Sequence, residues 1–333
     1  MRAAVTGGTG CLGRPLISKL LESGIKTRLL VLTQEQIPEE FKQQVEIIYG
    51  CLDSIDDLMK LVVNCDVVFH LAGKVHTVPK TPNEEKEFYR VNVDGTRNLV
   101  SACIDSGVKR IVFYSTVGVY GKDGNFHGDE RSKCEPVSVY AKTKVKAESI
   151  VLDCMNNGGP LGVILRLPVV YGAFDKGNVH RLIRAIRNKR FIIFGDGLSH
   201  RSFISALNAT EAALCAAFGD VPESSVFCIT DDNDYTMMEF VESICNALQT
   251  DWRPTHLSLS IATRIGKIAD SFENIIHRSL PINSSIVDKL SSPLTFSCEK
   301  AKNVLNYKPI YSLDRGILDE VEWLVPKIKT LGN

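Results

Sequence analysis

The stretch Met1–Gly13, MRAAVTGGTGCLG, decides how the rest of the chain is read. A short apolar run is followed by Gly7, Gly10 and Gly13, and a helical pattern then runs to Ser23-Gly24. A strand, a glycine-rich turn and a helix in this order are typical of a dinucleotide-binding start, where the backbone approaches a pyrophosphate at a helix N-terminus. The residues of this turn that we predict to contact a dinucleotide are Gly7, Thr9, Gly10, Cys11, Leu12 and Gly13.

The composition sets limits on the class of protein. The chain has 333 residues, 44% of them hydrophobic, and a formal net charge of zero. It is long enough for one large α/β domain with a smaller lobe, and its charge balance favours neither nucleic acid nor a membrane surface as a partner. We expect no signal peptide and no membrane span. The ten cysteines form no CxxC pair, so we predict a cytoplasmic protein with reduced thiols and no metal site.

Strands and helices alternate after the first helix. Apolar runs at 26–32, 45–49 and 66–72 predict three more strands, with helical patterns between them. This order predicts a Rossmann-like, doubly wound parallel sheet, whose ligand crevice lies at the carboxyl ends of the strands. An acidic residue at the end of the second strand would indicate NAD, and an Arg there NADP. Thr33 and Gln34 stand there instead, so both cofactors stay open.

The alternation continues to about residue 172. We predict a helix over 84–106, in which Gly95 marks close packing, a strand over 111–115, a substrate-facing polar loop over 121–136, a helix over 138–154 and a strand over 161–167. Beyond this point the pattern is less regular. We therefore predict an α/β protein with an NAD(P)-binding domain at 1–172 and a smaller, mainly substrate-binding mixed α/β lobe at 173–333, from which the chain can return to the core.

Tyr140 and Lys144 are the residues best suited to acid–base chemistry. They are four positions apart in a predicted helix and so share one face. A phenol has a pKa near 10, and lowering it by about 3 units takes about 4 kcal/mol, which a lysine and a positively charged nicotinamide can supply. Thr116, at the end of the fifth strand, can bind the same substrate oxygen. The alternative is an exposed surface pair, but the order of the motifs favours a catalytic one.

At this point the chain resembles a known family, the extended short-chain dehydrogenase/reductases of the sugar-nucleotide epimerase/dehydratase group. The resemblance rests on TGGTGCLG (6–13), HLAG (70–73), NVDGT (92–96), STVGVYG (115–121), YAKTK (140–144) and RLPVVYG (166–172). It implies that Tyr140 is the acid/base, that Lys144 binds the nicotinamide ribose and lowers the phenol pKa, and that Thr116 is catalytic. Tyr140 and Lys144 thus also contact the cofactor. The further cofactor contacts that we predict are Thr33, Cys51, Leu52, Leu71, Ala72, Gly73, Asn92, Ser115, Pro168 and Val170.

The sequence also departs from this family. Gly50-Cys51-Leu52 replaces a common Gly-Asp-Leu, which puts an adenine contact in doubt. Val117-Gly118 stand where 4,6-dehydratases carry Asp-Glu, and neither can move a proton, which argues against dehydratase activity. Arg201 matches the arginine that contacts the nucleotide diphosphate. The substrate contacts that we predict are Lys74, His76, Thr116, Val117, Asn178 and Arg201.

Two other features have more than one interpretation. His70 ends an apolar strand, which favours a structural role, whereas His76 in HLAGKVH could face substrate. The basic run that starts at Arg181 is more typical of a solvated helix face than of a phosphate site. Its members are Arg181, Arg184, Arg187, Lys189 and Arg190.

The first hypothesis for the function is an NAD(P)-dependent epimerase of a nucleotide-activated sugar, acting at C4 through a 4-keto intermediate. The alternatives are a 4-ketoreductase that consumes NAD(P)H, a hydroxysteroid- or flavonoid-type alcohol dehydrogenase with a more apolar substrate lobe, and a dinucleotide-binding regulatory protein without activity. The sequence leaves NAD against NADP open. By analogy with the family we predict a homodimer, formed through the helices that hold Asn92 and Tyr140.

Overall fold

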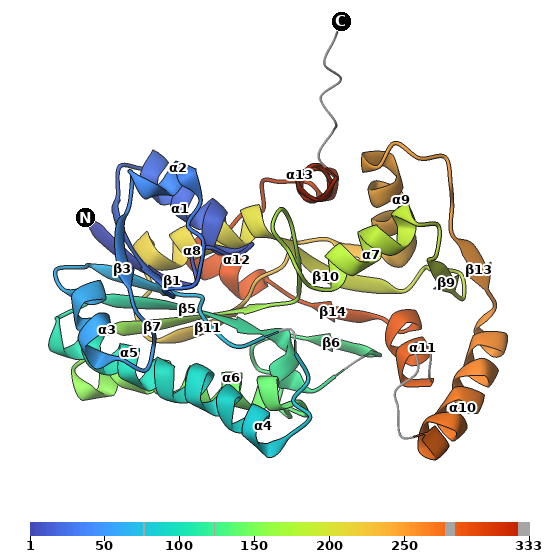
Figure 1. The fold of residues 1–333 in the computed structure, drawn as a ribbon, viewed down its shortest axis with the longest axis horizontal. Helices are drawn as coiled ribbons and strands as arrows, with labels where there is room; N and C mark the ends of the chain where they lie inside the picture. The colour runs from blue at the N-terminus through green and yellow to red at the C-terminus, as the bar shows by residue number, and fades with distance from the viewer. Residues whose placement is uncertain (76, 123, 277–283, 326–333) are drawn as a thin grey trace, which may run out of the picture.

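A seven-stranded parallel sheet forms the centre of the computed structural model, which describes all residues except 76, 123, 277–283 and 326–333 (Figure 1). The sheet order is β11-β7-β5-β4-β1-β2-β3. β1 pairs with β2 on one side and with β4 on the other, so the order reverses at β1 and the ligand crevice is expected at its carboxyl end. The strands are β1 (Arg2–Thr6), β2 (Lys26–Val31), β3 (Glu46–Tyr49), β4 (Val67–His70), β5 (Arg110–Thr116), β7 (Leu161–Leu167) and β11 (Ser225–Cys228).

Helices cover both faces of this sheet, as the doubly wound prediction requires (Figure 1). One face carries α1 (Gly13–Glu22), α2 (Glu39–Lys42), α8 (Ala206–Phe218) and α12 (Glu299–Leu305). The other carries α3 (Ile55–Val62), α5 (Gly95–Asp105) and α6 (Val139–Asp153). Both layers are apolar and buried, so the strands are hydrophobic on both sides. β11 and α8 follow residue 172 in the sequence, so the chain returns to the sheet.

The predicted long helix at 84–106 has three parts. α4 (Pro82–Tyr89) leads into a π-helical turn, η1 (Arg90–Asp94), and α5 follows without a break. Such π-helical turns occur often at functional sites. A Cβ on Gly95 would lie 2.7 Å from the Cβ of Leu52, so the close packing predicted for this glycine is confirmed.

A second sheet joins the two halves of the molecule. Its strands are β6 (Phe126–Gly128), β14 (Leu294–Phe296), β10 (His200–Ser205) and β12 (Asp234–Thr236), with β8 (Val169–Tyr171) also paired to β10. The segment 121–136 was expected to be a substrate-facing loop throughout, and this expectation is wrong for its middle part. The ring of Phe126 lies tilted against Tyr120 and edge-on to Phe296, at centroid distances of 6.1 and 6.0 Å, and this apolar contact helps to hold β6 in the sheet.

The rest of the second half is mainly helical. α7 (Asn178–Arg187), α9 (Met237–Ala247) and α13 (Leu313–Leu324) share one apolar cluster. The strands β9 (Ile192–Phe194) and β13 (Thr255–Leu257) pair, and α10 (Leu259–Ile276) and α11 (Ser284–Ser291) form an arm beside them (Figure 1). Within the described residues, no helix combines the length and apolarity that a membrane span requires. The short helices η2 (Val117–Tyr120) and η3 (Cys154–Asn157) complete the fold.

Candidate active site

The glycine-rich turn between β1 and α1 admits only glycine at two positions. Gly7 has φ +73°, a conformation that side chains rarely adopt. A Cβ on Gly13 would lie 2.4 Å from the Cα of Gly8 and 2.6 Å from the carbonyl oxygen of Gly7. The helix therefore starts in direct contact with the turn.

Gly10 differs from these two glycines because its Cα faces open space. The nearest atom to a Cβ built there is the carbonyl oxygen of Gly7, at 3.8 Å. The N-cap residue of α1, Leu12, makes no side-chain capping bond, and the first turn has no acidic residue. The N–H groups of Gly13 and Arg14 bond to the carbonyl oxygen of Gly10, and Pro15 has no N–H. The positive end of the helix dipole remains for an anion. The turn fits the pyrophosphate of a dinucleotide, which would supply a hydride acceptor or donor when bound.

His70 links this turn to the helices that follow. Its Nδ1 lies 2.8 Å from Oγ1 of Thr6, and its Nε2 lies 3.0 Å from Oγ1 of Thr96. Thr96 donates to the carbonyl of Asn92, so Nε2 carries the proton and Nδ1 accepts from Thr6. Burial lowers the pKa of His70 to about 3, which keeps the ring neutral. The structural role that the sequence favours for His70 agrees with these contacts.

Asn92 fixes the segment after β4 to the helix α6. Its Oδ1 accepts from the backbone N–H of Lys74 at 2.7 Å, and its Nδ2 donates to the carbonyl of Lys74 and to Oγ1 of Thr143. Thr143 donates in turn to the carbonyl of Tyr140. Asn92, predicted as a cofactor contact, thus positions the segment that carries Leu71, Ala72 and Gly73.

Tyr140 and Lys144 lie on α6 as predicted, with Ser138 capping the helix through a bond from the N–H of Ala141. The side chain of Lys144 is buried, and its Nζ donates to the carbonyl of Tyr114 at 2.5 Å. This ammonium also lies 3.8 Å from the ring centroid of Phe113, a favourable cation–π distance. Tyr140 itself is half-buried.

Burial acts in opposite directions on these two groups. It raises the pKa of Tyr140 to about 12 and lowers the pKa of Lys144 to about 7, the latter opposed by the negative charge of Glu148. A neutral Lys144 would not stabilise a phenolate. Base catalysis by Tyr140 therefore requires that Lys144 keep its proton and that a positive nicotinamide ring lie nearby.

Thr116 ends β5 and is half-buried. Its Oγ1 accepts a bond from the N–H of Gly118 at 3.1 Å, which caps η2. The hydroxyl proton of Thr116 is therefore still able to bind a substrate oxygen. Val117, predicted as a substrate contact, is half-buried in η2.

The other predicted cofactor residues follow the carboxyl ends of the strands. Thr33 is exposed just after β2, Cys51 is half-buried after β3, and Pro168 and Val170 follow β7. Two side chains have other partners. Leu52 packs against Gly95 in the core, and the buried hydroxyl of Ser115 donates to Glu148. The hydroxyl of Ser115 is thus bonded within the protein, and its contact with a cofactor stays a prediction.

The side chains of the predicted substrate residues do not point to one common site. Nζ of Lys74 lies 3.3 Å from Glu87, and Oδ1 of Asn178 accepts from Arg181 at the exposed start of α7. Arg201 is buried, and its Nη1 donates to the carbonyls of Lys289 and Ser292, at the end of α11. It thereby supports the arm, and its contact with a diphosphate stays a prediction. His76 lies outside the described residues.

Thr143, Glu148 and Arg166 also belong to this site and were not predicted from the sequence. Thr143 is a polar residue within YAKTK, and Glu148 lies four positions beyond Lys144, on the same helix face. The spacing of 140, 144 and 148 was the signal that could have identified Glu148. Arg166 offered none, because a charged residue within an apolar strand pattern does not reveal its partner.

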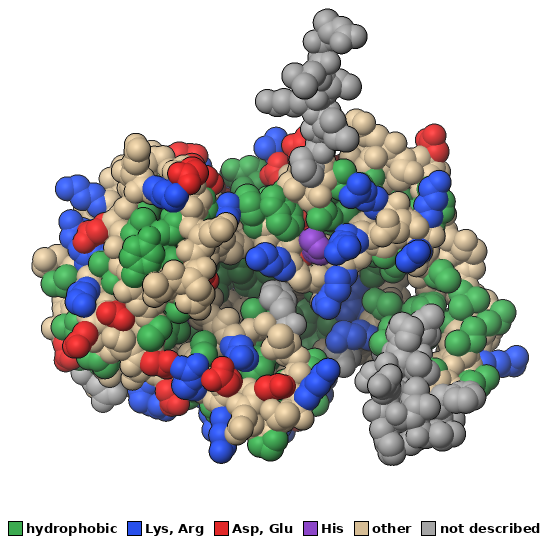
Figure 2. All heavy atoms as spheres, in the orientation of Figure 1, with side chains coloured by type: hydrophobic (Ala, Val, Ile, Leu, Met, Phe, Trp, Pro, Cys, Tyr) green, Lys and Arg blue, Asp and Glu red, His purple; other side chains and the backbone are tan. Residues whose placement is uncertain are grey.

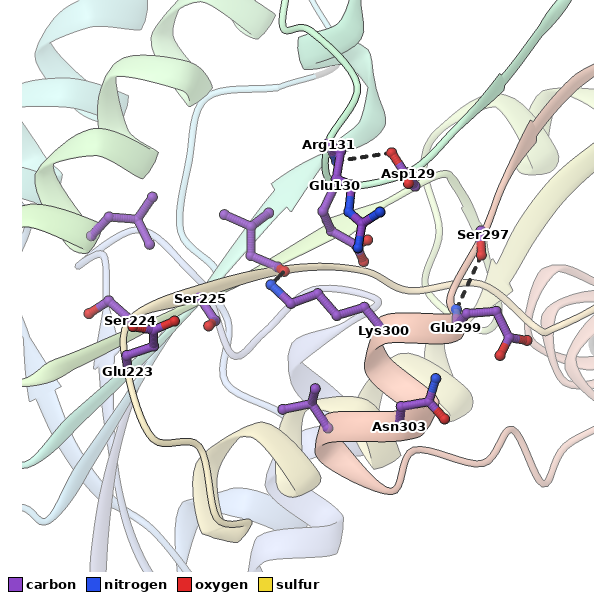
Figure 3. Close-up of a pocket in the computed structure, with 13 residues that line it drawn as sticks. Asp129, Glu130, Arg131, Glu223, Ser224, Ser225, Ser297, Glu299, Lys300 and Asn303 are labelled. Carbon is purple, nitrogen blue, oxygen red and sulfur yellow. Dashed lines mark hydrogen bonds between the residues drawn. The ribbon is translucent and has the colours of Figure 1, made fainter.

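A cavity of about 780 Å³ lies apart from these groups, between β11, α12 and the segment 129–131 (Figure 3). Nζ of Lys300 donates to the carbonyl of Val226, and Glu130 accepts from the N–H of Cys228. These two side chains occupy polar groups on the outer edge of β11, which protects that edge from pairing with another strand. In the described part of the chain no group of three or more His, Cys, Asp or Glu is arranged to hold a metal ion.

Comparison with known proteins agrees with this geometry. The model of the NAD dependent epimerase/dehydratase family matches residues 3–224. Among solved structures, MoeE5 in complex with UDP-glucuronic acid and NAD is similar, with a TM-score of 0.75 and 27% identity over 97% of this chain and 98% of that one. The UDP-glucuronic acid 4-epimerase of Bacillus cereus in complex with NAD has a TM-score of 0.74 at 22% identity, covering 97% and 98% of the two chains, which shows a shared fold.

Curated relatives point to a different kind of substrate. A 4-hydroxy-2-methyl-3-oxo-4-farnesyl-3,4-dihydroquinoline-1-oxide ketoreductase from Stigmatella aurantiaca is 29% identical over 313 residues, which is 92% of each chain. The human sterol-4-alpha-carboxylate 3-dehydrogenase, decarboxylating, is 27% identical over 327 residues, covering 94% of this chain and 85% of the relative. Membership of the family is therefore compatible with more than one substrate class.

Proposed function

Because this chain belongs to the NAD-dependent epimerase/dehydratase family, we propose that it is an epimerase of a nucleotide-activated sugar that acts at the C4 alcohol. The family and the neighbours in complex with NAD make it an NAD-dependent enzyme. In the proposed reaction Tyr140 removes the proton of the C4 hydroxyl group, and hydride from C4 would go to the NAD that the glycine-rich turn would hold. The resulting 4-keto sugar rotates in the site. Hydride then returns to the other face of C4, while Tyr140 returns the proton.

The chain's own residues divide this work. Thr116 binds the substrate oxygen through its free hydroxyl proton, which orients the alcohol toward Tyr140. Lys144 holds the phenolate by its positive charge, and the carbonyl of Tyr114 fixes its Nζ. The cofactor would be held by the turn from Gly7 to Gly13, by the segment 71–73 and by the residues after β7. Val117 and Gly118 offer no acid or base, so elimination of water is not part of the proposal.

The observation that carries the sugar-nucleotide substrate is the cationic surface of α7. Arg181, Arg184 and Arg187 are exposed on this helix, and Lys189 and Arg190 follow it. Among the described residues no carboxylate forms an ion pair with Arg184 or Arg187, in contrast to surface cations such as Arg90 and Lys122. Figure 2 shows Lys and Arg side chains gathered over α7, beside the hollow between the two halves of the molecule. The sequence alone favours a solvated face for this basic run, and its place beside the hollow is what supports attraction of a diphosphate.

A second candidate is an NAD(P)-dependent dehydrogenase or ketoreductase of an apolar alcohol or ketone. It is favoured by the exposed isoleucines of α10, where Ile261, Ile265 and Ile268 are 48%, 42% and 59% exposed. They lie at helical spacing on one face of the arm. The curated relatives named above act, by their names, on farnesylated and sterol substrates. The same Tyr140 and Lys144 would serve this reaction.

The retained dinucleotide separates the candidates first. We would denature the purified protein and identify any released dinucleotide by mass spectrometry. An epimerase regenerates its cofactor in every turnover, so tightly bound NAD followed by interconversion of UDP-sugar C4 epimers supports the proposal. An empty protein that binds NADPH and oxidises it with a 4-keto sugar or a 3-oxo sterol would overturn the epimerase in favour of a reductase. Tyr140→Phe is the control in each assay.

We also propose a homodimer, formed by the outer faces of α5 and α6. Both helices cover the same face of the sheet (Figure 1). Light scattering should give twice the chain mass at micromolar concentration, and a monomer mass independent of concentration would contradict this.

A further inference from the structure

Glu148 and Arg166 form a buried ion pair that the proposed chemistry leaves unexplained. Nη2 of Arg166 lies 2.7 Å from Oε2 of Glu148, and its Nε lies 3.1 Å from Oε1. The two side chains are only 7% and 4% exposed. Burying two charges costs solvation free energy, and apolar residues of similar volume often replace such a pair without loss of stability. Stability alone is therefore a weak explanation for this pair.

The carboxylate of Glu148 lies next to the groups that hold Lys144. Residues 140, 144 and 148 are each four positions apart in α6, so the three side chains form one stripe. Glu148 accepts a bond from the hydroxyl of Ser115 in β5. Ser115 stands between Tyr114, whose carbonyl accepts from Nζ of Lys144, and the catalytic Thr116.

We propose that Glu148 is the positioning residue for Lys144, and that its carboxylate, fixed by Arg166 and Ser115, keeps the Lys144 side chain an ammonium ion beside Tyr140. This inference rests on the proposed function, in which Lys144 serves the phenolate of Tyr140. Glu148 touches neither substrate nor cofactor in this scheme. It acts on the reaction through the charge and the place of Lys144.

Among the groups around Lys144, Glu148 is the one whose charge favours the ammonium form. On β4, His70 is neutral, and on α6 the phenol of Tyr140 is neutral until it reacts. On β5 the ammonium contacts a carbonyl and the ring of Phe113, neither of which carries a net charge. Arg166 on β7 is positive, so it cannot favour protonation of Lys144. Among the described residues, Glu148 alone is identified as raising the pKa of Lys144 against the effect of burial.

Arg166 is in turn anchored at its other end. Its Nη1 donates to the hydroxyl of Tyr120 at 3.0 Å, and that hydroxyl lies 3.2 Å from Sγ of Cys228 in β11. The carboxylate of Glu148 is thus held by contacts that reach β5, β7, η2 and β11. A carboxylate fixed on several elements keeps its distance to Lys144 without reliance on solvent, as preorganised sites require.

The test is the titration of Lys144 in the NAD-bound full-length protein, followed by NMR of ¹³Cε-labelled lysine. The signal is assigned by its absence from Lys144→Met. In Glu148→Gln we expect the pH at which Lys144 is half-protonated to fall by about one unit, a tenfold change in the ratio of ammonium to amine. Glu148→Asp keeps the charge and should recover most of the change. Glu322→Gln, an exposed glutamate on α13, is the matched control and should leave the titration unchanged.

An unchanged titration of Lys144 in Glu148→Gln overturns the proposal, because a merely structural role would not involve this charge. If Glu148→Gln does not fold, Ser115→Ala takes its place, since it keeps both charges and removes only the bond to β5. We then expect a smaller fall in the half-protonation pH of Lys144, and an unchanged value would again overturn the proposal. The titration needs no substrate. Full activity of Tyr140→Phe would instead overturn the proposed function, and would leave the Lys144 result standing.

Discussion

The two halves of the molecule differ in the side chains that they present where their ligands are proposed to bind. Around the cofactor end of the sheet, Thr6, His70, Thr96 and Asn92 are buried and bonded to one another or to backbone groups. In the substrate half, the cations of α7 and the isoleucines of α10 face solvent. A site for one fixed cofactor is preorganised within the protein, whereas a site for a variable substrate is completed by its ligand. The chemistry is thus better defined than the substrate.

Tyr140→Phe should have the largest effect, because it removes the proposed acid/base and should leave both halves folded. We expect kcat to fall by about 10²- to 10⁴-fold, the usual contribution of a positioned proton-transfer group, with little change in KM. Steady-state kinetics on the identified substrate, with circular dichroism for folding, measures this. Tyr49→Phe is the matched control, since Tyr49 is 57% exposed on β3. A Tyr140→Phe variant that keeps most of its kcat would show that the half that contains Tyr140 does not carry out the proton transfer.

Two glycines of the turn should separate binding from folding. Gly13→Ala places a methyl group against the backbone of Gly8 and Gly7, so we expect a loss of about 1–3 kcal/mol of stability together with weaker NAD binding. Gly10→Ala meets no protein atom closer than 3.8 Å and should keep its stability, yet bind NAD about tenfold more weakly or worse, because the methyl group occupies the space left for the pyrophosphate. Isothermal calorimetry and urea unfolding measure both quantities. Equal NAD affinity in Gly10→Ala would place the cofactor elsewhere.

The sequence could predict the features that depend on local geometry, but not those that depend on partners distant in the chain. Glycine-rich turns, apolar strands and the Tyr140–Lys144 spacing act through local geometry, so the parallel sheet and the placement of both residues on one helix were predictable. The partners of Arg201, Ser115 and Arg166 are distant in the chain, and no local pattern encodes them. β6 was missed for the same reason, since three residues in a polar segment become a strand only because β14 pairs with them.

Glu320 lies where the two halves meet and should respond to pH. It is fully buried on α13, and one carboxyl oxygen accepts from the N–H of Gly172 at 2.8 Å. Among the described groups, the other oxygen has no hydrogen-bond partner. Burial raises its pKa to about 8. The folded state therefore binds the proton more tightly than the unfolded state, and stability is lost as the pH rises from about 4.5 toward 8.

Glu320→Gln should remove this loss. We expect the variant to be more stable than the wild type by about 1–3 kcal/mol at pH 8, with the difference disappearing near pH 4. Urea unfolding at both pH values measures it, and Glu322→Gln, exposed on the same helix, should change neither value. Destabilisation at pH 8 would mean that the charged carboxylate has a partner in the folded state, and that the junction of the two halves is organised like the cofactor site.

The double variant Arg184→Gln with Arg187→Gln should have the smallest effect, yet it tests the substrate-binding half most directly. Exposed cations interact weakly through water, so we expect KM for a nucleotide-sugar to rise about 3- to 10-fold, with kcat unchanged and with the difference shrinking in salt. The paired variant Ile261→Ser with Ile265→Ser tests α10 in the same assay and should leave KM unchanged. If instead the isoleucine variant raises KM for an apolar ketone while the arginine variant does nothing, the substrate binds along the arm and the second candidate is correct. The cofactor-binding half would then act on a different substrate with the same Tyr140 and Lys144.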